Sequence, residues 1–436
     1  MDIVIYIAGA VLFFALVMAS IALHEVGHLV PGKIFGVKIT QYFVGFGRTI
    51  WSRRKGETEY GIKLIPLGGY VRLVGMFPPA PGAGGRVRRY STGPFRSIAD
   101  NARAAEYETI GPEDDGRLFY QKKSWQKLII MAGGPVMNII LAFVILLGVT
   151  GIYGVYRTQP VVSRVQECMI PAGAPDPTSC VGRPDTPAKL AGLQAGDRIV
   201  TFNGATISNW DEKSSAIRAN LAEPAQIVVE RDGQRVDLRP VNTVVSGVPD
   251  TWDPSKRVAA GFLGIEPTVL RQRGGPIAVV QDMWKMTEQT AYALVRFPAK
   301  VYYTAANLVT GKPRDIYGPM SIVGASRAAG EVAATDQLVS ADKVATLFSL
   351  LGSVNLFVAL FNFVPLLPLD GGHIAGALYE ALKRLLARVL RRPDPGHVDT
   401  ARMLPVAYVV GAAIALSGVV LIAADIIDPI RLFSTG

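Results

Sequence analysis

Two histidines and a glutamate near the N-terminus have the spacing of a hydrolytic metal site. They form the run His24-Glu25-Val26-Gly27-His28. In a helix, residues four apart share a face, so both imidazoles can bind one zinc ion while Glu25 takes a proton from a water molecule that the ion polarises. The same pattern occurs in proteins without a metal, where a histidine in an apolar helix is simply packed. The run uses two of the chain's four histidines, which favours the metal site.

The element that carries this motif is predicted to cross a membrane. Residues 3–23 contain no charged side chain, and roughly 20 apolar residues suffice to span a bilayer. A cleaved signal peptide is the alternative, but Asp2 stands where such a peptide has basic residues, and cleavage near Ala19 would leave the motif at a new terminus. Ionisable groups at membrane depth cost about 2.5–3.5 kcal/mol each, so they are kept mainly for function.

The whole chain has the composition of a membrane protein with a sizeable extramembrane part. It has 436 residues, 50% of them hydrophobic, and a mean hydropathy of +0.29. Four segments lack Asp, Glu, Lys and Arg and are long enough to span: 3–23, 128–156, 344–369 and 403–424. We therefore predict a polytopic α-helical membrane protein with four transmembrane helices.

The distribution of charge predicts the orientation of these helices. Residues 32–127 contain 17 Lys/Arg against 8 Asp/Glu, and residues 371–402 contain 6 against 3, whereas the long segment 157–343 is nearly neutral. Because short basic loops stay in the cytoplasm, the first two segments are predicted to be cytoplasmic, with 157–343 and both termini outside the cell membrane. The clustered Arg86, Arg88 and Arg89 lack interleaved aromatic residues, so we expect contact with anionic lipid headgroups and no nucleic-acid partner.

The two cysteines, Cys168 and Cys180, both fall in the segment that is predicted to lie outside. They flank a stretch rich in proline and glycine that has little means of holding its own shape. A disulfide is chemically sensible in an oxidising compartment, and two free thiols are the alternative.

A second polar motif follows the third apolar segment and can complete the metal site. It runs from Asn362 to His373 as Asn-Phe-Val-Pro-Leu-Leu-Pro-Leu-Asp-Gly-Gly-His. Its prolines and glycines interrupt a regular helix, which is tolerated at this depth where the backbone lines a cavity. Asp370 is predicted to be the third ligand, leaving the fourth position open for water as in catalytic zinc sites. His373 is a rival third ligand, placed closer to the cytoplasmic boundary.

Between the spans, the sequence predicts two β-rich regions. Residues 187–204 indicate a short helix, a strand and a tight turn, Arg231 to Gln234 a hairpin, and residues 260–265 the glycine-bracketed strand of a PDZ domain. Residues 59–76 alternate polar and apolar around Gly68 and Gly69, which predicts a cytoplasmic β-hairpin. Its strand either packs as plain sheet or offers an edge to an unwound substrate.

These motifs together resemble those of site-2 proteases, the zinc intramembrane metalloproteases of the M50 type. The likeness rests on HEVGH, on NFVPLLPLDGG, and on three further stretches: residues 119–138, Leu67 to Arg72, and Gly318 to Ile322. It covers nearly the whole chain and is similar to the actinobacterial branch with a single PDZ-like domain. Two departures are the long stretch 78–117 and the insertion between the cysteines.

The resemblance implies a reaction and the residues that perform it. Glu25 would be the catalytic base, and His24, His28 and Asp370 would bind one zinc ion. Substrate contacts would come from Asn362, Asn138, Gly68, Gly69 and Tyr70, although each asparagine could instead make an interhelical hydrogen bond. The implied substrates are single-pass proteins of the lipid bilayer, such as anti-sigma factors, already trimmed by another protease. The PDZ-like domain would filter substrates by size or bind peptides.

The predicted organisation follows from the spans and motifs. We expect a first helix at 1–31, a cytoplasmic hairpin region with a flexible loop at 32–127, a second helix at 128–156, and a PDZ-like α+β domain at 157–270. An amphipathic segment at 271–343, a third helix at 344–376, a cytoplasmic loop at 377–402 and a fourth helix at 403–425 complete the chain. The rival interpretation is a non-catalytic metal-binding scaffold or transporter with a PDZ-like recruitment domain. Spans two and four lack the acidic or histidine residues of a transport path.

Overall fold

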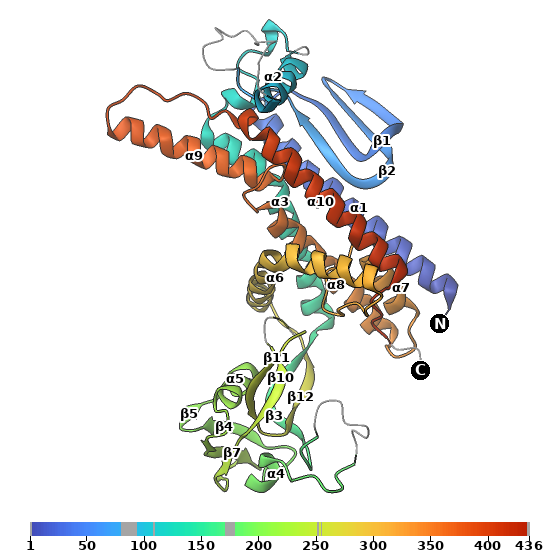
Figure 1. Ribbon diagram of the computed structural model, residues 1–436, viewed down its shortest axis with the longest axis vertical. Helices are drawn as coiled ribbons and strands as arrows, with labels where there is room; N and C mark the ends of the chain where they lie inside the picture. Colours follow the sequence, from blue (N-terminus) through green and yellow to red (C-terminus); the bar gives the residue numbers. More distant parts are fainter. Residues whose placement is uncertain are drawn as a thin grey trace. The chain divides into compact units, whose positions relative to one another are not determined.

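The computed structural model describes residues 2–79, 94–107, 110–170, 179–250, 253 and 255–433 (Figure 1). The chain forms two compact units, one built from residues 1–149 with 276–436 and the other from Thr150–Gly275. The predicted lipid-contacting arginines, Arg86, Arg88 and Arg89, lie outside the described residues.

Among the described residues, four helices of the first unit are long and apolar enough to cross a membrane, which confirms the predicted polytopic helical class. They are α1 (Ile3–Ile34), α3 (Ser124–Gly148, continued to Tyr153 by a π-helical turn), α8 (Ser340–Asn362) and α10 (Leu404–Ile427, preceded by a 3₁₀ turn at Thr400–Met403). Helices that are apolar on all sides bury some residues against each other and leave the rest for lipid.

Helices α1 and α3 approach each other at glycine residues. A Cβ atom built on Gly133 would lie 1.9 Å from the carbonyl oxygen of Gly27, so neither helix tolerates a side chain at this crossing. Small residues allow membrane helices to approach closely, and van der Waals packing then holds the two helices together. The crossing lies one turn or less from both histidines, so it places α3 directly against the candidate site.

The third span ends earlier than we expected. In place of one helix over 344–376, α8 stops at Asn362, and a new helix, α9 (Asp370–Val389), occupies the first half of the predicted loop 377–402. Pro365 and Pro368 account for the break, because proline lacks the amide that would continue the hydrogen-bond ladder. Asp370 therefore begins a helix instead of standing in an unwound end.

The hairpin predicted within residues 59–76 has other bounds in the structure: Gly68 and Gly69 lie inside a single strand, β2 (Thr58–Leu73), and its partner is an earlier strand, β1 (Ile39–Lys55). Both strands are long and bend. The second half of β1 pairs with the first half of β2, from Thr49 with Lys63 to Lys55 with Thr58. The first half of β1 pairs antiparallel with residues 69–73 and also lies against residues 59–62. Within the described chain, residues 69–73 are thus paired along one side only, as an edge.

The described part of the stretch after the hairpin is helical where we expected a flexible loop. It contains α2 (Pro94–Tyr107). The carboxylate of Glu106 accepts hydrogen bonds from the amides of Gly75, Met76 and Phe77 at 2.7, 2.7 and 3.2 Å. Buried Arg103 forms a two-pronged hydrogen bond with Asp399, which precedes α10. These contacts hold α2 between the end of β2 and the start of the last span.

The amphipathic segment predicted at 271–343 forms two helices, α6 (Pro276–Thr310) and α7 (Ile322–Ala334). Val279 and Met283 of α6 pack in one apolar cluster with Leu356 of α8. A buried ion pair between Arg314 and Asp425, 2.6 Å apart, ties the connection between α6 and α7 to the end of α10.

The second unit is an α+β domain around an antiparallel sheet. The strand order is β12 (Ile265–Gln272), β3 (Val155–Val165), β4 (Arg198–Phe202), β7 (Ile227–Arg231) and β8 (Gln234–Asp237), with β5 (Ala205–Thr206) beside β4. Helices α4 (Pro187–Ala191) and α5 (Trp210–Ala219) and two small strand pairs, β6 (Pro224–Ala225) with β9 (Val241–Asn242) and β10 (Val244–Pro249) with β11 (Arg257–Phe262), complete it. Its core includes Val162, Ile199, Phe202 and Ile227.

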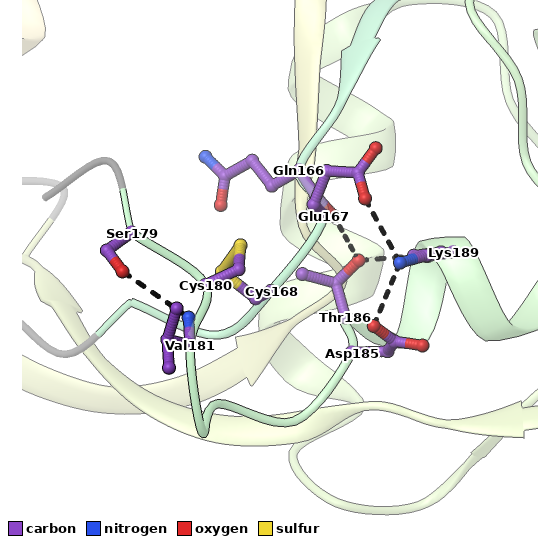
Figure 2. The surroundings of a disulfide bond; sticks show 9 residues. All are labelled: Gln166, Glu167, Cys168, Ser179, Cys180, Val181, Asp185, Thr186 and Lys189. Atoms are coloured by element: carbon purple, nitrogen blue, oxygen red, sulfur yellow. Dashed lines mark hydrogen bonds and ion pairs between the residues drawn. A yellow bond between two sulfur atoms is a disulfide. The ribbon is translucent and has the colours of Figure 1, made fainter.

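The sulfur atoms of Cys168 and Cys180 are bonded in this unit, and the two Cα atoms lie 5.7 Å apart (Figure 2). Beside the bridge, Lys189 of α4 contacts Glu167 at 3.0 Å and Asp185 at 2.9 Å. Thr186 caps α4 by accepting a hydrogen bond from the Lys189 amide. The bridge closes the loop that leaves β3 and returns to α4.

Candidate metal centre

Three potential ligand atoms meet where α1 passes the first residue of α9. The Nε2 atoms of His24 and His28 lie 3.2 Å apart, and each is 3.3 Å from Oδ2 of Asp370. Both histidines are buried. They lie on one face because four residues separate them in a continuous helix. The geometry supports the predicted ligand set, and these three residues are the group in the described chain that could hold a metal ion.

The dimensions of this cluster fit a tetrahedral zinc ion. Zinc binds histidine nitrogen and carboxylate oxygen at about 2.0–2.2 Å, which sets neighbouring ligand atoms of a tetrahedron about 3.3–3.6 Å apart. The three observed separations of 3.2, 3.3 and 3.3 Å lie at the lower end of this range, within 0.1 Å of it. Two imidazoles and one carboxylate leave a fourth vertex for water, as in zinc hydrolases.

Gly134 of α3 provides the space for such an ion. A Cβ atom on Gly134 would lie 2.3 Å from Nε2 of His28 and 2.6 Å from Nε2 of His24, close to the bonding distance of a metal. Any larger side chain would therefore fill the space that the two imidazoles face. The glycine at this position leaves a cradle on the side of the ligands opposite to α1.

Helix α3 also holds the two imidazole rings in orientation. Nδ1 of His28 lies 2.8 Å from the carbonyl oxygen of Ile130, and Nδ1 of His24 lies 3.2 Å from the side-chain amide of Asn138. For Nε2 to bind a metal, Nδ1 must carry the proton and donate it, as metal-bound histidines do to a second partner. Oδ1 of Asn138 is buried without a hydrogen-bond partner in the described chain. If the oxygen and nitrogen of this amide exchange places, Oδ1 accepts the hydrogen bond that Nδ1 of His24 donates, and both atoms are satisfied.

A cavity of about 760 Å³ opens onto the cluster. It is lined by Glu25 and the three ligand residues, by Asn362 of α8, and by residues 68–73 of β2. A Cβ atom on Gly69 would lie 3.0 Å from Cγ of Glu25, so the strand edge runs directly beside the carboxylate. Ala102 and Glu106 of α2 form another part of the wall. The cavity thus places a candidate base, a metal site and a strand edge around one space.

The predicted site residues fall into two groups. Glu25, Asn362, Gly68, Gly69 and Tyr70 all line the cavity with the ligand residues. Asn138 is buried behind His24, where it makes the interhelical contact that was its alternative role. His373 lines the cavity as well, but it is not part of the three-residue cluster.

Three contributors to the site were missed by reasoning from the sequence: the Gly134 cradle, the Ile130 carbonyl and the wall formed by α2. The glycine pair at 133–134 is the signal that could have indicated close approach to another helix. A backbone carbonyl such as that of Ile130 leaves no signal in a sequence. The Gly/Pro/Arg-rich composition before α2 concealed the helix that follows it.

Comparison with known proteins identifies this arrangement. The model of peptidase family M50 matches residues 12–390. The chain belongs to peptidase family M50. It is 32% identical to zinc metalloprotease Rip1 of Mycolicibacterium smegmatis over 98% of both chains. It is 29% identical to zinc metalloprotease Rip1 of Mycobacterium tuberculosis strain H37Rv, over 98% of this chain and 99% of the relative. Metalloprotease MmpA of Caulobacter vibrioides is 27% identical over 84% of each chain.

This M50 protein is therefore a multi-pass membrane zinc metalloprotease. The match spans three of the four membrane helices and both halves of the candidate site. Membership in a family of zinc peptidases sets aside the rival interpretation as a scaffold or transporter. The His24, His28 and Asp370 cluster is consistent with its zinc site.

Proposed function

We propose that this M50 peptidase cleaves pre-trimmed single-pass membrane proteins in or next to their membrane segment, with one zinc ion held by His24, His28 and Asp370. The observation that carries the proposal is the position of the cluster. Its two histidines lie on α1, a helix long and apolar enough to span a bilayer, and the cavity beside them is lined by a strand edge that has no pairing partner in the described chain. Water must reach this cavity for hydrolysis to occur at membrane depth.

Glu25 is the proposed general base. When bound, the ion supplies a Lewis acid that polarises the scissile carbonyl and the attacking water. Glu25 takes a proton from that water and passes it to the leaving amine. Ile130 and Asn138 keep the protons of both imidazoles on Nδ1, so that each Nε2 stays available as a ligand.

Residues 69–73 of β2 are proposed to receive the substrate. A helix hides its peptide carbonyl in its own hydrogen bonds, so cleavage requires local unwinding, and a strand edge can take up the freed backbone groups. Gly69 supports this role because its lack of a side chain brings the strand to Glu25. The Asn362 amide lines the same cavity and is proposed to hold the substrate backbone or the developing oxyanion.

The cellular setting is proposed from charge and from the family. The basic segments 32–127 and 371–402 would face the cytoplasm, with both termini and the α+β unit outside a plasma membrane. The α+β unit, in the region predicted as PDZ-like at 157–270, is proposed to exclude intact ectodomains by size. Substrates of the anti-sigma factor type, cut first by another protease, would then release a cytoplasmic fragment in regulated intramembrane proteolysis.

Replacing Glu25 by Gln tests the proposal. We expect Glu25→Gln to keep zinc, measured by elemental analysis of the purified protein, and to abolish cleavage of a co-expressed, pre-trimmed single-pass substrate. Glu223→Gln, an exposed glutamate of the α+β unit, is the matched control and should cleave normally. Undiminished cleavage by Glu25→Gln would remove Glu25 from the mechanism. Membrane proteomics of the same pair would identify the substrates as half-trimmed proteins that accumulate.

A further inference from the structure

Helix α9 carries an exposed apolar face that no part of the described chain covers. Six residues form this face, and each is half or more exposed: Leu378, Tyr379, Leu382, Leu385, Leu386 and Val389. Their spacing of three, four and seven places them on one side of the helix. Beyond its first turns, α9 projects sideways from the bundle of membrane helices (Figure 1). An exposed apolar stripe of this length is typical of a surface that binds another protein or a membrane.

The opposite side of α9 is fixed to the protein. Buried Glu380 accepts hydrogen bonds from Lys127 at 2.9 and 3.0 Å and from Ser124 at 3.1 Å, both on the first turn of α3. Burial alone would raise the pKa of Glu380, but His397 and Lys127 lower it to about 2, so the carboxylate stays charged. The pair with α3 sets the rotation of α9, and the apolar stripe therefore faces away from the bundle.

The position of α9 in the chain places it at a membrane surface. The third candidate span ends at Asn362 and the fourth begins at Thr400, so the chain between them, which includes α9, stays on one side of the bilayer. Its bonds to Ser124 and Lys127 tie it to the first turn of another span, at that same side. Glu380, together with three basic residues, makes α9 too polar to span by itself.

Basic residues border the apolar stripe. At 100° per residue, Lys383 falls beside one edge of the stripe and Arg388 beside the other. Arg391 and Arg392 follow at the end of the helix, and both are exposed with Arg388. Arg384, by contrast, is occupied by Glu380 at 3.2 Å and Asp394 at 3.5 Å. An apolar face between two basic borders matches a bilayer surface, because long basic side chains can extend to the headgroups.

We propose that α9 is an interfacial helix that inserts its apolar face among the acyl chains and binds anionic lipid headgroups through Lys383, Arg388, Arg391 and Arg392. The proposal does not depend on which substrates are cleaved. It has a consequence for the site, because Asp370 is the first residue of α9. The lipid that binds α9 thereby helps to hold the helix on which this ligand lies.

Spin labels on introduced cysteines measure the depth of α9. The two native cysteines are joined, so a cysteine replacing Leu382 or Leu386 carries the only label. In the full chain reconstituted into nanodiscs, we expect both labels to be more accessible to oxygen than to a water-soluble nickel chelate. A label at exposed Gln234 of the α+β unit should show the reverse. Nickel-accessible labels at 382 and 386 would overturn the proposal, and dipolar broadening between copies would assign the face to a second copy instead.

Lipid selectivity is the second measurement. Removing the four cations, as Lys383→Gln, Arg388→Gln, Arg391→Gln and Arg392→Gln together, should lower the preference for spin-labelled phosphatidylglycerol over phosphatidylcholine at least about fivefold, the effect of roughly one surface cation. A control with the same charge change replaces four exposed arginines of the α+β unit: Arg164, Arg198, Arg235 and Arg239. An unchanged preference in the first variant overturns headgroup binding.

Zinc retention tests the link to Asp370. During dialysis against a chelator in nanodiscs that contain phosphatidylglycerol, the variant without the four cations on α9 should lose zinc faster than the α+β control. Equal loss would overturn the coupling between lipid and ligand. Because none of these measurements uses proteolysis, a failure here is distinct from a failure of the proposed cleavage reaction.

Discussion

The replacement Gly134→Ala should remove zinc from the site without unfolding the protein. The added Cβ would lie 2.3 Å from Nε2 of His28, whereas a carbon and a nitrogen in contact normally lie about 3.5 Å apart. One group must therefore move by about 1 Å, and zinc ligands hold their distances within about 0.2 Å. Neither imidazole can turn away cheaply, because Ile130 and Asn138 hold both rings. We expect zinc affinity to fall at least about a hundredfold, the upper end of the effects of outer-shell changes.

Gly148→Ala is the matched control for this experiment. Gly148 lies on the same helix, and a Cβ there would meet no atom within 4 Å. Alanine in a helix is favoured over glycine by about 0.5–1 kcal/mol, so this variant should be as stable as the parent or slightly more so. Zinc content by elemental analysis and affinity by chelator competition separate the two variants. Full zinc occupancy and normal cleavage in Gly134→Ala would refute the placement of the metal between α1 and α3.

Three further predictions concern the edge strand, a buried ion pair and a buried lysine. Gly69→Ala should reduce cleavage while zinc is retained, because its Cβ would press on Glu25 at 3.0 Å; loss of zinc would contradict this role. The pKa of Glu380 is lowered to about 2, so its stabilising contribution is complete above the unfolded value near 4.5 and is lost as the pH falls towards 2. Glu380→Gln should flatten that acid limb in pH-dependent unfolding, and an unaltered limb would exclude the pair as its cause. Burial lowers the pKa of Lys213 to about 7, so the α+β unit should gain stability from pH 7 towards 10. Lys213→Met should remove this pH dependence and stabilise the unit by about 1–3 kcal/mol, as measured by hydrogen exchange in the full chain. A loss of stability would instead show that the Trp210 ring, over which the ammonium lies, stabilises this charge enough to offset its burial.

The membrane helices and the partners of the metal motif could be predicted because their signals are local and strong. Uncharged runs of more than twenty residues have few alternatives to a span. The spacing of His24 and His28 fixes their common face as soon as the segment is helical. Asp370 could be chosen as their partner because few other acidic residues border an apolar run in this chain. Alternation over residues 59–76 correctly predicted β structure there, but the glycine pair lies inside β2, and the partner strand β1 was not identified from the sequence.

The parts that reasoning from the sequence did not find depend on contacts between distant segments. The uncharged run continues through residue 369, and Pro365 and Pro368 indicate a break without fixing the residue at which α8 ends or the new helix that begins at Asp370. Glu106 and Arg103 of α2 give no sign of their roles in the sequence, because their partners, the amides of residues 75–77 and the side chain of Asp399, are distant in the chain. Asn138 was assigned to substrate binding because an asparagine suits both a substrate contact and an interhelical hydrogen bond. Its position beside His24 in the structure indicates the interhelical contact.

The origin of the ligands from α1 and α9 bears on how the protein is made. About 350 residues separate His24 from Asp370, and at ribosomal speeds of about 5–20 residues per second they take roughly 20–70 s to synthesise. During that time the nascent chain contains His24, Glu25 and His28 but not yet Asp370, so the ligand set is incomplete while the chain is inserted beside other new membrane segments. A peptidase assembled in this way stays inert beside its neighbours until nearly all of it has been translated.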